Sequence, residues 1–286
     1  MAPLELQRFG EVGDFLDVAG AFLVEREAEH NLILGISSNL RDSPEAFSGD
    51  AYLAAVRSGR RVVAAALQTP PYQLVLSEVD DPAAIGLLVE DLLDRDLPAV
   101  LGPVEHVRAF VDQWTARGGP ASYLHMSERI FRLTEVRPPA RVPGRWRVAE
   151  LSDRDLVLDW TDAFLREALD EADLVEVATL TDRWLARRGR TLYLWEDEKA
   201  VSMAGVGSRT PNGVRIGPVY TPPDARRRGY ASALVSAVSQ AELDAGRRLC
   251  FLFTDRANAT SNHIYQAIGY EPVRDVESYR FERPVA

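Results

Sequence analysis

The chain has 286 residues, of which 46% are hydrophobic and 27% charged, and its formal net charge is −10. This composition is typical of a folded protein, and the length suits two domains better than one core. The acidic balance argues against nucleic acid as a partner, and no apolar run approaches the ~18 residues of a membrane-spanning helix. We therefore expect a cytoplasmic protein that binds neither nucleic acid nor a membrane.

The first half of the chain alternates helix-like and strand-like segments. The hydrophobic spacing predicts helices at residues 15–26, 30–40, 83–94 and 105–117, and strands at residues 61–67, 73–77, 99–101 and 129–133. Up to Pro139 there are nine more acidic than basic residues, and after it only one more. An acidic surface suits a cationic small molecule or a basic peptide as partner, although acidity also keeps many proteins soluble.

The clearest boundary lies at residues 137–144, where three prolines and a glycine separate two strand-like runs. We predict a linker there, with one domain at residues 1–137 and a second at residues 138–286.

The second half repeats the order of elements seen in the first. It shows, in chain order, a strand at 146–149, helical stretches at 153–168 and 174–187, strands at 191–195, 201–207 and 215–221, a helix at 229–244, a strand at 249–253, a helix at 261–268 and a strand at 279–281. We therefore predict a mixed α/β fold built from two tandem copies of one unit.

The sharpest local signal follows the strand at 215–221. Prolines end this strand, Arg226, Arg227 and Arg228 follow, and Gly229 opens a helix. The first N–H groups of a helix lack internal partners and lie at its positive end, so a phosphate there gains hydrogen bonds and a favourable field. Gly229 permits close approach of the backbone, and the small Ala231 keeps the helix entrance open. The simpler interpretation is a solvated basic turn that caps the helix.

A second motif leaves the strand at 249–253. After Asn258, Ser261 is placed to cap a short helix that Gly269 ends. Tyr265 lies on that helix. Taken alone, it is equally well explained as an aromatic side chain packed under the sheet with its hydroxyl at the surface.

Both motifs together resemble the GNAT superfamily of acyl-CoA-dependent N-acyltransferases. The family's Q/R-x-x-G-x-G/A loop matches Arg226, Gly229 and Ala231. Its later N-x-x-(S/A)-x-x-x-Y pattern, followed by G-F/Y, matches five further residues: Asn258, Ser261, Tyr265, Gly269 and Tyr270. The resemblance covers about residues 146–281 and implies a GNAT-like fold with acetyl-CoA as acyl donor.

The resemblance also implies the roles of individual residues. Contacts to acetyl-CoA are expected from the end of the fourth strand, the arginine loop, the start of the next helix and the second motif: Val219, Tyr220, Thr221, Arg226, Arg227, Arg228, Gly229, Tyr230, Ala231, Ser232 and Asn258. The strand end would pair with the pantetheine arm and offer N–H groups to the oxyanion, and the arginines would screen the pyrophosphate. Tyr265 is the expected catalytic residue, because its hydroxyl would protonate the departing thiolate.

A general base is not assignable from the sequence. Phe253 stands where several relatives have a glutamate. Glu167 and Asp173 are candidates for the lining of an acceptor pocket, and a solvated helix face explains them as well. A path through water is equally open.

The first half lacks the cofactor motif. Where its own pyrophosphate loop would lie, it has Glu78, Asp80 and Asp81, whose charges would repel a pyrophosphate. We therefore predict that residues 1–137 form a degenerate GNAT-like domain without a cofactor loop.

Four scattered histidines, at positions 30, 106, 125 and 263, show no metal-binding spacing, so we expect no metal site. The sequence thus predicts an acetyl-CoA-dependent N-acetyltransferase that acts on an amine of a small molecule or peptide. The alternative is a non-catalytic acyl-CoA sensor or scaffold. A role of the first half as a partner-docking module is compatible with either.

Overall fold

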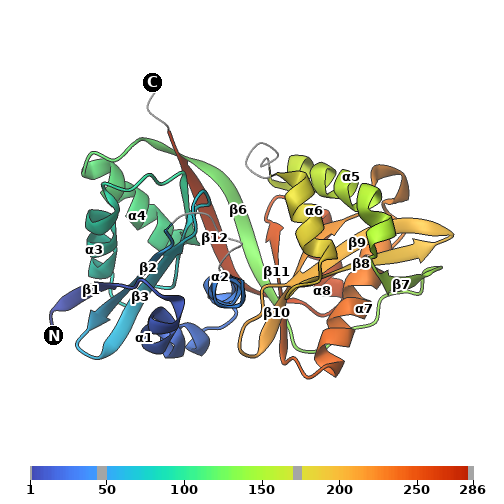
Figure 1. Cartoon of the computed structure of the whole chain (residues 1–286), viewed down its shortest axis with the longest axis horizontal. Helices are drawn as coiled ribbons and strands as arrows, with labels where there is room; N and C mark the ends of the chain where they lie inside the picture. The colour runs from blue at the N-terminus through green and yellow to red at the C-terminus, as the bar shows by residue number, and fades with distance from the viewer. Residues whose placement is uncertain (1, 44–49, 170–175, 283–286) are drawn as a thin grey trace. The chain divides into compact units, whose positions relative to one another are not determined.

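The computed structural model describes residues 2–43, 50–169 and 176–282. The chain divides into two compact units (Figure 1). The first unit comprises Met1–Ile130 together with Val273–Ala286, and the second comprises Phe131–Pro272. The predicted boundary lay at residue 137 and assigned the last residues to the second domain, so the compact units differ from it at both places.

The first unit is a mixed sheet with helices on both faces. Its elements are β1 (Leu4–Arg8), α1 (Val12–Glu25), α2 (Asn31–Asp42), β2 (Tyr52–Ser58), β3 (Arg61–Gln68), β4 (Leu74–Leu76), α3 (Ala83–Leu92), β5 (Ala99–Pro103), α4 (Val104–Ala116) and the start of β6 (Ser122–Leu133). Strands β1 to β4 are antiparallel neighbours, β4 and β5 are parallel, and β12 pairs antiparallel with β5.

Burial along β3 explains why this sheet needs helices on both faces. Successive side chains of a strand point to opposite faces, and seven successive residues of β3 are buried, so both faces are covered. Helices α3 and α4 contribute Leu88, Phe110 and Trp114 to one core cluster with the strands. Helix α1 packs against β2 and β3 through its own buried side chains, which include Phe15 and Leu23.

The second unit has the same order of elements. These are β7 (Arg145–Val148), α5 (Arg154–Phe164), a π-helical turn η3 (Leu165–Leu169), α6 (Val177–Leu185), β8 (Thr191–Asp197), β9 (Lys199–Gly207), β10 (Gly213–Tyr220), α7 (Tyr230–Asp244), β11 (Leu249–Asp255), α8 (Ala259–Ala267) and the start of β12 (Glu271–Phe281). Strands β7 to β10 are antiparallel neighbours, whereas β10 and β11 are parallel. The predicted mixed α/β fold with two copies of one unit is therefore confirmed.

The last strand of each half runs through both units. Strand β6 begins in the first unit, and its final residues Phe131 and Leu133 lie in the core of the second. Strand β12 begins in the second unit and ends in the first, where it pairs with β5 and places Phe281 against Trp114 at a ring distance of 5.2 Å. Neither unit is complete without residues from both halves of the sequence.

The segment predicted as a linker packs on the second unit. The N–H of Arg137 donates to the carbonyl of Ile268 at 2.9 Å, and Trp195 Nε1 donates to the carbonyl of Pro143 at 2.9 Å. Val142 packs against the core cluster that contains α7. This segment is therefore part of the second unit.

Candidate functional site

The predicted anion loop lies between β10 and α7. Gly229 is the N-cap of α7 and has φ +83°, and a β-carbon there would lie 2.9 Å from Val142 Cγ1. Both the backbone conformation and the lack of space therefore require glycine. Arg227 has φ +62°, a conformation that is uncommon for residues with a side chain and is concentrated at functional turns. The backbone thus turns sharply just before the positive end of the helix.

The first turn of α7 is anchored through Tyr230. This side chain is buried, and its hydroxyl donates to Asp197 at 2.5 Å at the end of β8. That bond raises the pKa of Tyr230, so the phenol remains a donor. Ala231 and Ser232 follow in the same turn and are half-buried. The N–H groups of this turn have no partner within the helix.

The side chain of Arg226 has a structural partner that the sequence did not indicate. Its Nη2 donates to Glu167 at 2.6 Å and its Nε donates to the carbonyl of Thr221 at 2.8 Å. The guanidinium also lies over the ring of Tyr220, 5.7 Å from its centroid. The two partners of this guanidinium lie on η3 and just beyond β10, so Arg226 connects both segments to the loop.

Strands β10 and β11 separate next to this loop. They pair at three successive positions, beginning with Gly213 opposite Leu249, and both strands continue beyond the paired stretch. On its other edge β10 stays paired with β9, with a bulge between Ile216 and Val219. Within the described chain, the end of β10 therefore has one edge that no strand pairs.

The second motif forms the turn into α8. The side chain of Asn258 accepts a bond from the N–H of Ser261 at 3.0 Å and so caps the helix. Asn262, which belongs to neither sequence motif, holds the preceding loop by donating to the carbonyls of Asp255 and Asn258 at 3.0 and 2.9 Å. In the structure, the side-chain oxygen of Asn258 serves the helix cap.

Tyr265 lies in the core of the second unit. It is 8% exposed, and its ring packs edge-on against Tyr270 at 6.0 Å. Burial raises the pKa of Tyr265 to about 12, so its hydroxyl is protonated at neutral pH, as a proton donor must be. A buried and protonated phenol therefore fits both interpretations of Tyr265: packing in the core and the predicted catalytic role.

The three positions considered for a general base have different surroundings. Phe253 lies beside the guanidinium of Arg215, 6.0 Å from ring centroid to Cζ. Glu167 is bound to Arg226, and its other oxygen accepts from Tyr220 at 3.1 Å. Asp173 lies outside the described residues.

The first unit has a bulge at the place that corresponds to the bulge of β10. Just beyond β4, the N–H of Ser77 donates to the carbonyl of Ala65 at 2.9 Å, and the N–H of Asp80 donates to the carbonyl of Val63 at 2.8 Å. The two donors are three residues apart, whereas the two acceptors on β3 are only two residues apart. In β10 the same mismatch of three against two occurs. Glu78 therefore occupies the position that Gly217 has in the second unit.

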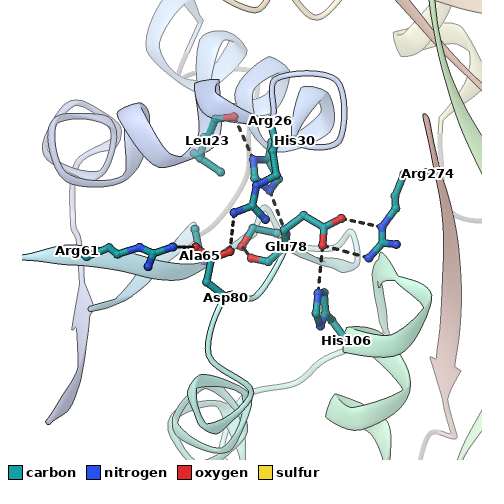
Figure 2. Close-up of polar contacts among 10 residues, drawn as sticks. Leu23, Arg26, His30, Arg61, Ala65, Glu78, Asp80, His106 and Arg274 are labelled. Atoms are coloured by element: carbon teal, nitrogen blue, oxygen red, sulfur yellow. Dashed lines mark hydrogen bonds and ion pairs between the residues drawn. The ribbon is translucent and has the colours of Figure 1, made fainter. Parts of the chain in front are cut away.

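Side chains of the first unit fill the space around this bulge (Figure 2). The carboxylate of Glu78 binds His106 Nε2 at 3.1 Å and Arg274 Nε at 2.7 Å. The N–H of Glu78 donates to His30 Nε2 at 3.0 Å, and His30 Nδ1 donates to the carbonyl of Leu23 at 3.0 Å. Burial lowers the pKa of His30 to about 4, which keeps its ring neutral and able to accept the bond from Glu78.

The remaining acidic residues of this region are also paired. Asp80 binds Arg26 and Arg61, each at 2.5 Å, and Asp81 accepts from the N–H of Ala83 at the start of α3. From the sequence, these carboxylates were expected to repel a pyrophosphate. In the structure, arginines balance the charges of Glu78 and Asp80, so the main obstacle to a ligand is the filled space.

One group of potential metal ligands occurs in the described residues. Glu78, Glu105 and His106 bring ligand atoms within 4.8 Å of one another, which the spacing of the histidines did not suggest. Arg274 pairs with both carboxylates, so their charge is already compensated within the protein.

In the described part of the chain, no helix is both long and apolar enough to span a membrane.

The sequence matches known proteins through a family model, and the structure resembles them in fold. Residues 148–270 match the model of the acetyltransferase (GNAT) family. No curated protein matches the sequence.

Solved structures resemble the chain in fold. A Drosophila protein is 15% identical, with a TM-score of 0.70 over 97% of this chain and 98% of its own. A tandem GNAT protein from the clavulanic acid biosynthesis pathway is 14% identical, with a TM-score of 0.56 over 99% and 100%. A GCN5-related N-acetyltransferase from Kribbella flavida is 16% identical, with a TM-score of 0.56 over 78% and 88%. At these identities, the likeness is one of fold.

Proposed function

Because residues 148–270 form a domain of the GNAT family, we propose that this protein transfers an acetyl group from acetyl-CoA to an amine of a small molecule or peptide. The observation that carries the proposal is the joint placement of two features in the second unit. A helix N-terminus opened by Gly229 lies beside a bulged strand whose end has an unpaired edge. The first feature suits a pyrophosphate and the second an extended amide-containing arm.

The pyrophosphate would bind at the start of α7. Its oxygens would accept bonds from the N–H groups of Gly229 and the residues after it, and the helix field favours the negative charge. Gly229, with φ +83°, supplies the turn that leads into these N–H groups. Arg227 and Arg228 supply the neighbouring positive charge.

The pantetheine arm would then run along the end of β10. It contains peptide-like amides, so Val219 to Thr221 would pair with it as a neighbouring strand would. The acyl carbonyl would lie near the bulge, where backbone N–H groups can stabilise the charge that develops on its oxygen.

The reaction itself needs an attack and two proton transfers. The amine nitrogen bonds to the acyl carbon, the carbon–sulfur bond breaks, and the electron pair leaves on sulfur. Tyr265 would give its proton to the thiolate, and the proton of the new amide nitrogen would return through water. With its pKa raised by burial to about 12, the Tyr265 phenol carries at neutral pH the proton that this step needs.

We infer that one acetyl-CoA binds per chain, in the second unit. In the first unit the carboxylate of Glu78, held by His106 and Arg274, stands at the corresponding bulge, and His30 takes the N–H of Glu78. That unit would therefore offer neither the open strand edge nor the free amide.

A screen of amines with acetyl-CoA, followed by release of free CoA thiol, tests the proposal. We expect one class of amine to give turnover well above the hydrolysis seen without acceptor, and Tyr265→Phe protein to lose it. Tight binding of acetyl-CoA without thiol release for any amine would instead support the sensor, which Phe253 in place of a carboxylate favours.

A further inference from the structure

Three residues near the proposed cofactor site form a closed set of contacts. Oε1 of Glu167 accepts from the Tyr220 hydroxyl at 3.1 Å, and Oε2 accepts from Arg226 Nη2 at 2.6 Å. The guanidinium of Arg226 completes the set by lying over the Tyr220 ring. Each residue belongs to a different segment: η3, the end of β10 and the arginine loop.

Residues of this set and of neighbouring elements hold the end of β10 from several sides. Arg226 Nε donates to the carbonyl of Thr221 at 2.8 Å. From β9, the buried Ser202 donates to the carbonyl of Tyr220 at 3.1 Å and contacts the hydroxyl of Thr221 at 2.9 Å. Trp160 of α5 packs near the Tyr220 ring, at 6.2 Å between centroids. In the described residues, these contacts hold the strand end where β11 does not pair with it.

The ionisation states suit this arrangement. Burial, followed by the negative charge of Glu167, raises the pKa of Tyr220, so the phenol stays protonated and keeps donating. The ion pair of Glu167 and Arg226 is about half exposed on both sides, at 45% and 44%. A pair of that exposure stabilises a fold little, so its effect is on geometry.

The loop arginines therefore divide into two kinds. Within the described part of the chain, Arg226 is the loop arginine that forms an ion pair, and its Nε and Nη2 are directed at Thr221 and Glu167. Arg227, with its positive φ, and Arg228 come directly before the N-cap of α7.

We propose that Glu167, Tyr220 and Arg226 form a clamp that fixes the end of β10, and that Arg226 acts through this clamp and not as a ligand of phosphate. Glu167 and Arg226 are thereby positioning residues for the thioester arm. The inference rests on the proposed function, since it assigns a role within the same acetyl-CoA site. Arg227, Arg228 and the amides of α7 then bind the pyrophosphate.

Calorimetry with CoA on the full-length protein separates the roles. We expect Arg227→Gln and Arg228→Gln each to weaken binding by about ten-fold, as the loss of a charge-assisted contact does. Glu167→Gln and Arg226→Gln should each change it by less than about three-fold, and the double variant should change it no more than either single one, because both changes open the same clamp. Asp162→Asn is the matched control, since it removes the exposed ion pair between Asp162, near the end of α5, and Arg166, four residues later on η3.

Turnover provides the second readout, with whichever amine the screen identifies. Glu167→Gln and Arg226→Lys should lower kcat about ten-fold with KM for acetyl-CoA within three-fold, since a misplaced strand end misaligns the thioester. The Asp162→Asn control should keep the wild-type rate.

Three results would overturn the clamp. Tighter CoA binding by Glu167→Gln protein would mean that Arg226 is a phosphate ligand held back by Glu167. Additive losses in the double variant, or unchanged kcat in both single variants, would also contradict it. Each of these requires wild-type protein that binds CoA, whereas failure of wild-type protein to bind CoA would refute the proposed function itself.

Discussion

Gly229 and Val142 meet at the entrance of α7, where a β-carbon on the glycine would lie 2.9 Å from Val142 Cγ1. Val142 belongs to the segment that was predicted as a linker, and Gly229 is the residue most needed for the proposed phosphate site, so the contact joins the two. Together with φ +83° at Gly229, it leaves little room for substitution.

Gly229→Ala should therefore lower both stability and CoA affinity. We expect the free energy of unfolding to fall by about 1–3 kcal/mol because of backbone strain, and CoA binding to weaken because the methyl group displaces the loop. Gly246→Ala is a matched control at the other end of α7, where φ is +95° and a β-carbon meets no atom within 4 Å. It should cost similar strain and leave the CoA affinity unchanged; equal loss of affinity in both variants would mean that general destabilisation is the cause.

Tyr265→Phe should separate binding from turnover. The change keeps the ring and its packing but removes the proton that the thiolate would receive, so the rate should fall by roughly 10²- to 10⁴-fold with CoA affinity within a few-fold. Tyr270→Phe is the control, because the hydroxyl of Tyr270 lies 2.9 Å from Ser239 Oγ in the core. That variant should lose about 1 kcal/mol of stability and little rate. An unimpaired Tyr265→Phe enzyme would assign Tyr265 to packing alone.

Acid should destabilise the first unit through His30. The pKa of His30 is about 4 in the folded protein against an ordinary value of 6.5, so the unfolded chain takes up this proton first as the pH falls. Stability is therefore lost between about pH 6.5 and pH 4, by about 3 kcal/mol in total. Hydrogen exchange of the β3 and β4 amides at pH 7 and pH 4.5 measures this loss of stability.

The matched variant for this test is His30→Gln, which has no group that titrates in this window. It should be less stable at pH 7, because the bonds to Leu23 and Glu78 are altered, but nearly independent of pH down to 4.5. If the wild-type amides lose no protection between these two values, the neutral His30 assigned here is wrong.

Truncation after Tyr270 should unfold the first unit although it removes only the end of the chain. Residues Val276–Arg280 pair with β5, and the buried carboxylate of Glu277 binds Arg108 through two bonds of 2.8 and 2.6 Å. Trp114, the one tryptophan in the first unit's sequence, would lose its contact with Phe281 and become exposed. Tryptophan fluorescence reports the exposure of Trp114, and limited proteolysis reports the unfolding of the first unit. A truncated protein with a protected first unit would contradict the shared strands described above.

The sequence predicted best what depends on neighbouring residues. The arginine loop, Gly229 and the following helix were placed correctly, because turn residues and helical spacing act within a few positions. Strand β1 and strand β2 were missed, and β6 and β12 were predicted too short. Polar residues such as Glu128 and Asp275 interrupt the hydrophobic pattern of the long strands.

Such local patterns could not predict contacts between residues that are distant in the sequence. Glu167 and Arg226 are 59 positions apart, and Glu78 and Arg274 are 196 apart. The pairing of β12 with β5 likewise joins a strand late in the second half of the sequence to a strand of the first half, so it could not be inferred from a boundary marked by prolines. Charge counting alone suggested repulsion at Glu78, whereas the folded chain supplies the compensating arginines.

We propose that acetyl-CoA binds once, at the start of α7 in the second unit. Calorimetric titration of the full-length protein with CoA tests it most directly. We predict one equivalent per chain, lost in Gly229→Glu protein and retained in Glu78→Gln protein. Two equivalents for the wild-type protein, or one equivalent that survives Gly229→Glu in a folded variant, would contradict the account.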